Sequence, residues 1–244
     1  MTGIEALIED LVTANKILAN EGVVDAFGHV SVRHPDNPGR YLLARARTPQ
    51  CIEASDIMEF DLDGTPIEPR GRSPYLERYI HGAIYEAHQQ VNCVVHSHSH
   101  SVIPFGVGGE SIRPLLHNCA VIGPQVPIWD SRDKFGDTDL LVSNMAMGRD
   151  LGESMRACPT CLMRGHGAVA SGRSLRSAVF TAIALHTSAE LQAQSSRFET
   201  IKFLSPGEIE KIMAMFDALE AKGGGDRAWE YWCHRAAVLF RPRS

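Results

Sequence analysis

The N-terminal part of the chain combines one helical pattern with several strand-like patterns. Apolar residues between Ile4 and Leu18 recur every three or four positions, which predicts an amphipathic helix that ends near Gly22. The segments that then predict strands, by alternation or by short apolar runs, are 27–33, 41–43 and 57–61. Gly64 lies in a turn after the last of them. We expect the helix to pack on a sheet of short antiparallel strands.

A second helix is predicted to begin at Ser73-Pro74. Serine is a favoured N-cap, and proline suits the first helical position, where its missing N–H would lack a partner anyway. Apolar residues from Leu76 to Ala87 form the stripe of this helix that we expect to be buried. Glu77 falls in the first turn, where the helix dipole favours a carboxylate. A stabilising surface glutamate is therefore one interpretation of this residue.

A buried strand is predicted to end in a series of alternating histidines. Apolar residues fill most of 91–95, and His96, His98 and His100 follow. Successive side chains of a strand point to opposite faces, so these imidazoles share one face. Imidazole is the commonest metal ligand in proteins, and two imidazoles at a strand end can share one ion. The alternative is a polar strand end with solvated histidines, because short motifs often arise by chance.

A further histidine, His166, lies between two glycines and between two predicted short strands. Apolar residues at 162–163 and 168–170 predict those strands. Glycine allows unusual backbone dihedral angles and the close approach of a ligand. The segment is compatible with a simple turn, or with a third imidazole supplied from a second strand end.

Two more helices are predicted in the C-terminal part. Ser174 precedes a long helical pattern, and Ser205-Pro206 opens another with a capping box. The glycines at 223–225 are interpreted as a flexible hinge before an aromatic segment at 228–232. We expect a single domain over residues 1–244.

Composition places the chain among soluble globular proteins. Of its 244 residues 44% are hydrophobic, which is enough to bury one sizeable core. The formal net charge is -5 without a block of basic residues, so neither nucleic acid nor a membrane surface is an expected partner. No apolar run approaches transmembrane length, and the N-terminal residues lack the order of a signal peptide. We therefore expect a cytoplasmic protein.

The six cysteines do not predict a disulfide framework, since that inference applies to short secreted chains. Cys158 and Cys161 form a single C-x-x-C pair without the second pair that a structural zinc site requires. Cys161 leads into an apolar, strand-like segment, whereas a redox pair would begin a helix. We expect reduced, structural thiols.

The order of these motifs resembles the class II aldolase/adducin family. The matching elements are a Gly-His-Val-Ser loop at 28–31, Glu77 with His81, the His96-Ser97-His98 motif and the glycine-flanked His166. The similarity extends over nearly the whole chain. Each motif is weak alone, and the order and spacing of all four carry the resemblance.

The resemblance implies a three-layer α/β/α sandwich with a central, mainly antiparallel sheet. It also implies one divalent metal ion per subunit on the matches of the family's three histidines, His96, His98 and His166. Glu77 matches the family's glutamate, which ligates the metal or acts as acid/base once substrate is bound. Zinc, manganese, cobalt and iron all suit such ligands. The family's usual assembly is a C4 homotetramer, so we expect a homo-oligomer.

The first loop departs from the sugar-phosphate members of the family. Those members carry an asparagine that helps to bind phosphate where this chain has His29, and a Ser-Ser pair where it has Ser73-Pro74. The residues around His29, Glu77 and His96 are more similar to a subgroup of metal-dependent decarboxylases of hydroxylated aromatic dicarboxylates. The same subgroup includes an iron oxygenase that acts on hydroxyaromatic acids.

The leading interpretation is a metal-dependent lyase that decarboxylates a hydroxylated aromatic or heteroaromatic acid. The ion would stabilise the charge left when CO2 departs, and Glu77 would carry the proton. His29, Ser31 and one of Arg47 or Arg78 would bind the second carboxylate of the small acidic substrate. Retro-aldol cleavage and iron-dependent oxygenation are the alternatives. A non-enzymatic, adducin-like role is disfavoured because the ligand set is complete.

Two further expectations concern the assembly and the extra histidine. Active sites of this family usually lie between subunits, and Trp229, Tyr231 and Trp232 are aromatic residues able to complete a neighbour's site, Tyr231 first among them. The alternative for large aromatic residues is the hydrophobic core. The two-histidine motif does not require His100, so we expect His100 to lie outside the ligand set.

Overall fold

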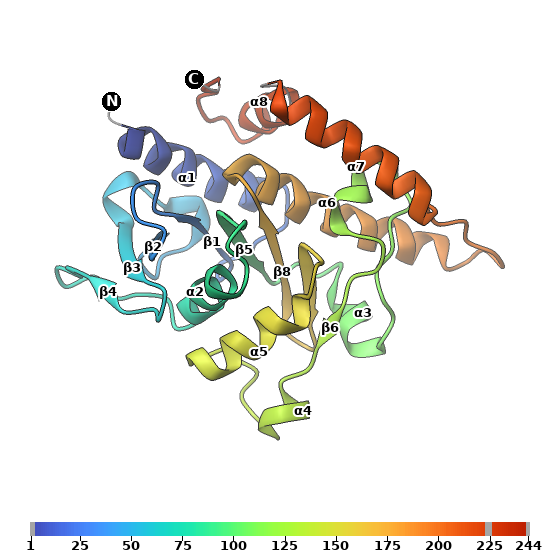
Figure 1. Cartoon of the computed structure of the whole chain (residues 1–244), viewed down its shortest axis with the longest axis horizontal. Coiled ribbons are helices and arrows are strands. Elements are labelled where there is room, and N and C mark those ends of the chain that lie inside the picture. The colour runs from blue at the N-terminus through green and yellow to red at the C-terminus, as the bar shows by residue number, and fades with distance from the viewer. Residues whose placement is uncertain (1–2, 223–225, 243–244) are drawn as a thin grey trace.

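An eight-stranded sheet forms the centre of the molecule (Figure 1). The computed structural model describes residues 3–222 and 226–242. The strands are β1 His29–Arg33, β2 Arg40–Ala44, β3 Ile57–Asp61, β4 Pro66–Ile67, β5 Cys93–Ser97, β6 Ile128–Trp129, β7 Thr160–Met163 and β8 Gly167–Gly172. They lie in the order β4-β3-β2-β1-β5-β8-β7-β6. Only the β6–β7 pair is parallel among these strands, so the prediction of a mainly antiparallel sheet is confirmed.

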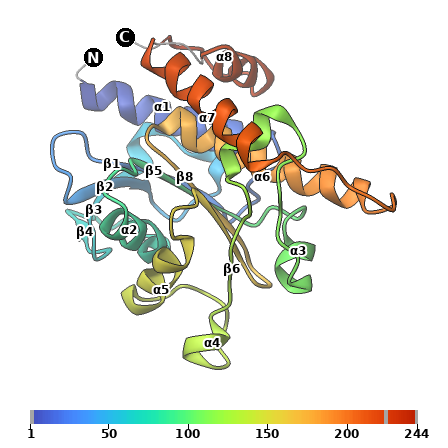
Figure 2. The ribbon, with the colours of Figure 1, turned by 45° about the vertical axis from the view of Figure 1, so that its right-hand side comes forward.

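Helices cover both faces of this sheet (Figure 2). The α-helices are α1 Gly3–Asn20, α2 Arg78–Ala87, α3 Ile103–Gly108, α4 Arg132–Phe135, α5 Met145–Met155, α6 Leu175–Ser195, α7 Pro206–Ala221 and α8 Asp226–Arg235. Helices α1 and α6 pack on one face, against β1, β5 and β8. Helices α2 and α5 pack on each other and cover the opposite face. The result is the predicted three-layer α/β/α sandwich.

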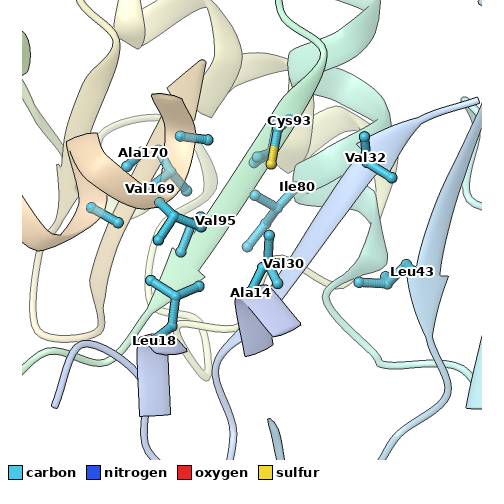
Figure 3. Packing of buried hydrophobic residues seen from close by; sticks show 14 of the residues in the cluster. Ala14, Leu18, Val30, Val32, Leu43, Ile80, Cys93, Val95, Val169 and Ala170 are labelled. Carbon is cyan, nitrogen blue, oxygen red and sulfur yellow. The ribbon is translucent and has the colours of Figure 1, made fainter. Parts of the chain in front are cut away.

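Strand alternation directs apolar side chains toward α1 and polar ones toward α2. Val30 of β1 is paired with Val95 of β5, and both lie beside Leu18 of α1 in the core (Figure 3). Full burial of such a side chain contributes about 1.5–3 kcal/mol to stability. The neighbouring strand positions His29 and Ser31 have side chains that bond to α2 instead. The pleat therefore separates the hydrophobic core from a polar face under α2.

Two glycines allow α2 to lie close to its neighbours. A Cβ on Gly82 of α2 would come within 1.9 Å of the Leu62 carbonyl oxygen, in the turn after β3. A Cβ on Gly148 of α5 would lie 2.7 Å from the carbonyl oxygen of Tyr79. Any larger residue at either position would push the backbones apart. The glycines thus hold α2 between the sheet and α5.

The helix predicted at Ser73-Pro74 begins later, at Arg78. Pro74 instead forms an antiparallel bridge with Arg45, and Leu76 is 67% exposed rather than part of a buried stripe. Glu77 is the N-cap residue, and its side chain does not cap the helix. The predicted helix start was therefore wrong. Backbone pairing with a distant segment outweighed the local preference of serine and proline for a helix N-terminus.

The predicted starts of the two C-terminal helices are confirmed. The Ser174 hydroxyl accepts a hydrogen bond from the Ser177 N–H at the start of α6. Ser205 and Glu208 form the reciprocal capping box of α7, at 3.2 Å and 2.7 Å. The expected glycine hinge at 223–225 lies outside the described residues.

The aromatic residues of α8 divide between the core and the surface. Trp229 and Trp232 are buried, and the Trp232 ring packs edge-on against Phe180 of α6. Tyr231 is 56% exposed. The two tryptophans therefore belong to the hydrophobic core, and Tyr231 is the exposed aromatic residue of this helix, with Arg235 over its ring.

The cysteines and the helix lengths agree with the sequence expectations. All six cysteines are free thiols, and Cys161 is buried in β7. Within residues 3–222 and 226–242, every helix is too short or too polar to cross a lipid bilayer.

Candidate metal centre

Four side chains from three separate segments converge at the end of β5. We call Glu77, His96, His98 and His166 the ligand cluster; one donor atom of each lies within 4.8 Å of the others. The Nε2 atom of His98 is 3.1 Å from the Nε2 atoms of both His96 and His166. The Glu77 Oε2 atom lies 3.4 Å from His96 Nε2 and 3.3 Å from His166 Nε2.

The fold positions these histidines through the β5–β8 pairing. His96 ends the apolar run of β5, and His98 follows immediately beyond that strand. His166 lies in the turn from β7 to β8, where Gly165 has a φ of +68°, a conformation that favours glycine. A Cβ on Gly167 would lie 2.0 Å from the Ser97 carbonyl oxygen. The glycines on both sides of His166 thus allow the turn to lie directly against the end of β5.

Contacts behind the cluster orient the donor atoms inward. His166 Nδ1 donates to the Leu140 carbonyl oxygen at 2.9 Å, and His98 Nδ1 faces the Asp25 carboxylate at 3.5 Å. For His166 and His98 these contacts favour a proton on Nδ1, which leaves the Nε2 lone pair toward the cluster; His96 Nδ1 is buried without a hydrogen-bond partner. Glu77 Oε1 accepts from the Val142 N–H at 2.9 Å, which leaves Oε2 toward the histidines.

The donor set fits a divalent cation. Converging nitrogen lone pairs and a carboxylate oxygen repel one another at these distances, and a cation between them turns the repulsion into coordination. Three imidazoles and one carboxylate form a ligand set used for zinc and other transition metals. The structure brings together His96, His98, His166 and Glu77, the four residues that the sequence analysis named as ligand candidates.

Charge effects within the cluster act in opposite directions on its members. Burial raises the pKa of the Glu77 carboxyl, but His96 and His166 outweigh burial and hold that pKa below its usual range. Burial lowers the pKa of His166, but Glu77 reverses the effect and raises it. Burial, together with His96, lowers the pKa of His98 to about 4. Glu77 is therefore ionised at neutral pH, as a metal ligand must be.

A second polar group lies beside the cluster, beneath α2. His29 Nδ1 is 2.7 Å from His81 Nε2, and the Ser31 hydroxyl is 2.7 Å from both His81 Nδ1 and the Tyr85 hydroxyl. We call these four side chains the buried chain, since none is more than 2% exposed. Burial lowers the pKa of His29 well below its usual value and that of His81 to about 3, so both imidazoles are neutral. The His29 ring lies 5.0 Å from the His96 ring.

The other predicted substrate-binding residues lie outside this arrangement. The Arg47 guanidinium pairs with Asp56 at 2.6 Å. Arg78 donates to the carbonyl oxygens of Gly64 and Tyr75 at 2.7 Å and 3.0 Å. Tyr231 lies on α8, at the opposite end of the molecule from α4 and α5 in both views (Figures 1 and 2). The structure therefore joins only His29 and Ser31, among these residues, to the surroundings of the ligand cluster.

His100 is exposed and does not belong to the ligand cluster. The chain leaves the extended conformation after Ser97, so the alternation expected through position 100 ends before it.

The sequence analysis assigned no role to two groups of residues that support the ligand cluster and the buried chain. His81 and Tyr85 are four residues apart, so they share one face of α2, and two polar residues within an apolar stripe were the available signal. Leu140 and Val142 act through backbone groups, which any residue type provides. Leu140 has a φ of +67°, unusual for a residue with a side chain.

Comparison with known proteins gives a consistent result. A sequence model of one family, described as "Class II Aldolase and Adducin N-terminal domain", matches residues 9–193. The chain is 33% identical over 201 residues to decarboxylase tropJ of Talaromyces stipitatus, covering 77% of this chain and 76% of that protein. It is 29% identical over 247 residues to a 3,4-dihydroxyphthalate decarboxylase of Arthrobacter keyseri, covering 95% and 93%.

A solved structure supports the fold. An aldolase II superfamily protein from Pseudomonas syringae superimposes with a TM-score of 0.77 at 21% identity, covering 97% of this chain and 94% of that one.

Proposed function

Because the chain belongs to the class II aldolase/adducin family, we propose that it is a divalent-metal-dependent carbon–carbon lyase that decarboxylates a hydroxylated aromatic or heteroaromatic acid. The observation that carries the proposal is the ligand cluster, in which three imidazoles and a carboxylate converge. The direction toward decarboxylation comes from the relatives, two of which are named decarboxylases. The fold alone would fit an aldolase equally well.

His96, His98 and His166 would hold the ion throughout the cycle, and Glu77 would be a fourth ligand until substrate binds. When bound, a divalent cation supplies Lewis-acid stabilisation of the negative charge that develops as CO2 leaves, worth several kcal/mol. Zinc, manganese, cobalt and iron remain compatible with these donors. The protein's own contribution is the fixed orientation of the Nε2 atoms, set by Leu140 behind His166 and by Asp25 behind His98.

Glu77 is the proposed proton carrier. It is a carboxylate at the start of the cycle, so it can accept the proton of the substrate hydroxyl, whose acidity a bound cation would increase. It then gives this proton to the ring carbon that bears the departing carboxylate. The C–C bond to the carboxylate breaks, CO2 leaves, and the electron pair of that bond restores the aromatic ring. The negative charge returns to the substrate oxygen, which leaves as a phenolate and takes its proton from water. The two transfers leave Glu77 ionised again.

His29 is the proposed contact for a substrate oxygen. Its ring lies against His96 and is 4.5 Å from the Tyr75 ring. Ser31 acts behind His29, since it is fully buried and bonded to α2. Arg47 and Arg78 are weaker candidates, because Asp56 and backbone carbonyls already occupy their guanidinium groups.

We further propose a homo-oligomer, with a tetramer as the favoured state, in which the exposed Tyr231 reaches the site of a neighbouring subunit. Sedimentation velocity over a wide range of dilutions is expected to give a tetramer whose activity declines on dissociation. An active monomer at every dilution would contradict the shared site.

The proposed reaction is tested by measuring metal and products on the same preparation. Protein purified without oxygen is expected to carry about one divalent ion per chain by elemental analysis, the stoichiometry of a single four-donor site. With a panel of hydroxylated aromatic mono- and dicarboxylates, CO2 release without O2 consumption is the expected result. O2 consumption would favour the oxygenase alternative, and an aldehyde product without CO2 would favour retro-aldol cleavage.

A further inference from the structure

The buried chain runs from the middle of α2 to the edge of the ligand cluster. His29 and His96 are direct cross-strand partners on β1 and β5, so their side chains lie on the same face of the sheet. Ser31 is two residues along β1 and shares that face. His81 and Tyr85 lie one turn apart on α2. His81 bonds to both His29 and Ser31, and Tyr85 bonds to Ser31. Every link measures 2.7 Å, so the chain is continuous.

A count of hydrogens gives the direction of these bonds. In one arrangement Tyr85 donates to Ser31, Ser31 donates to His81 Nδ1, and His81 Nε2–H donates to His29 Nδ1. Every hydrogen along the three links then has an acceptor, and the His29 Nε2–H remains at the free end. In the reverse arrangement His29 Nδ1–H donates to His81 Nε2, and His81 Nδ1–H donates to Ser31. The Ser31 and Tyr85 hydroxyls can then donate only to each other, and only one of them can do so at a time. Leaving one buried O–H unpaired carries a substantial energetic cost, so the first arrangement is favoured.

The free end of the chain is His29 Nε2. The fully buried side-chain atoms without a partner, among the described residues, are His96 Nδ1, Ser188 Oγ and Trp229 Nε1. His29 Nε2 is not one of them, although no described residue forms a hydrogen bond with it, so a small part of this atom is accessible to solvent. The other ring nitrogen of His29, Nδ1, is bonded to His81 of α2, so Nε2 lies on the side of the ring away from that bond. The His29 ring lies beside the His96 ring.

We propose that Tyr85, Ser31 and His81 are positioning residues that fix His29 in the Nε2–H tautomer. His29 thereby presents a hydrogen-bond donor to an anionic oxygen, a carboxylate or phenolate, at the ligand cluster. This inference rests on the proposed function for the identity of the oxygen, but the tautomer itself does not depend on the reaction. A hydrogen bond from this N–H to an oxygen anion is charge-assisted and therefore stronger than one to a neutral oxygen. A ring nitrogen that carries its proton also has no lone pair with which to bind the metal ion.

The tautomer can be measured by 15N NMR of histidine-labelled, zinc-loaded protein. The expected spectrum has the His29 proton on Nε2 and a bare Nδ1, and the His81 proton also on Nε2. Protonation of His29 at Nδ1 would overturn the inference, whatever reaction the enzyme catalyses.

A pair of variants separates positioning from mere packing. Ser31→Ala and Tyr85→Phe each remove one buried hydroxyl, yet only Ser31→Ala breaks the link to His81. We expect Ser31→Ala to populate both His29 tautomers, because no hydroxyl then donates to His81 Nδ1, and this bond is what favours the Nε2–H form. We expect Tyr85→Phe to keep the Nε2–H form, because Ser31 can still donate to His81. An unchanged tautomer in Ser31→Ala would overturn the positioning role, and backbone spectra check that both variants fold.

The donor role has its own readout, the affinity for 2-hydroxybenzoate measured calorimetrically with zinc-loaded protein. His29→Leu is expected to weaken binding about tenfold or more, as expected for a hydrogen bond to a charged group, with zinc content unchanged. Equal affinity in His29→Leu would overturn the donor role. If the tautomer and affinity results hold but no acid in the panel releases CO2, the proposed reaction fails and the inference stands.

Discussion

Replacing His98 with alanine is expected to weaken metal binding about a hundredfold or more and to abolish turnover. Loss of groups that only orient metal ligands already costs about 10–100-fold in affinity, so loss of a ligand itself should exceed that range. His98 is the cleanest of the three histidines to test, because its side chain is 20% exposed, whereas that of His96 is fully buried. His96→Ala and His166→Ala should lose the metal in the same way. Elemental analysis after dialysis, with CO2 release on the same samples, measures both effects.

The matched control for this experiment is His100→Ala. His100 is two residues further along the chain and exposed, and it lies outside the ligand cluster. It should keep its metal and its activity, and its thermal unfolding should match that of the parent protein. Full metal occupancy in His98→Ala, or metal loss in His100→Ala, would show that the ligands at the end of β5 are assigned wrongly.

Glu77→Gln is expected to retain the metal and lose turnover by about a hundredfold or more. A positioned general acid or base contributes at least that factor, and an amide keeps the shape of the side chain but cannot carry the proton. The amide oxygen can still accept from the Val142 N–H, so the local structure should persist. Single-turnover CO2 release at matched metal content measures the loss. Solvent deuterium should enter the wild-type product at the carbon that lost CO2.

Glu86→Gln is the matched control, because Glu86 lies on the same helix but is exposed and pairs with Arg149 on the surface. Surface ion pairs contribute little to stability, so this variant should behave as the wild type. Loss of the metal together with the activity in Glu77→Gln would make Glu77 an essential ligand instead. Turnover near the wild-type rate would remove Glu77 from both roles.

The sequence predicted the ligand cluster because the residue types themselves carry the metal chemistry. Alternating histidines after an apolar strand and a histidine between glycines made a metal site one interpretation, and the family resemblance selected it over solvated histidines and a simple turn. Glu77 needed the family resemblance, since a glutamate near a helix start has a simpler explanation. The start of α2 was misplaced because the bridge between Pro74 and Arg45 joins segments far apart in the sequence, and local capping rules do not include such pairing.

The surroundings of the cluster were much less predictable. Arg47 and Arg78 were reasonable carboxylate ligands by residue type, but nearby partners already occupy them. The Leu140 carbonyl and the Val142 N–H position ligands through the backbone and leave no trace in the residue type. The buried chain could not be predicted from the sequence, because its prediction requires knowing that one turn of α2 lies over His29 and Ser31 of β1.

The separation of the ligands along the chain links metal uptake to folding. Glu77, the end of β5 and the β7–β8 turn meet only in the folded protein, so an unfolded chain cannot offer the same four donors. By mass action, free metal at a hundred times its dissociation constant would then add about 2.7 kcal/mol to the free energy of unfolding. The unfolding temperature of this protein should therefore rise with the free-metal concentration, and the metal supply in the cell would help to set how much folded enzyme survives.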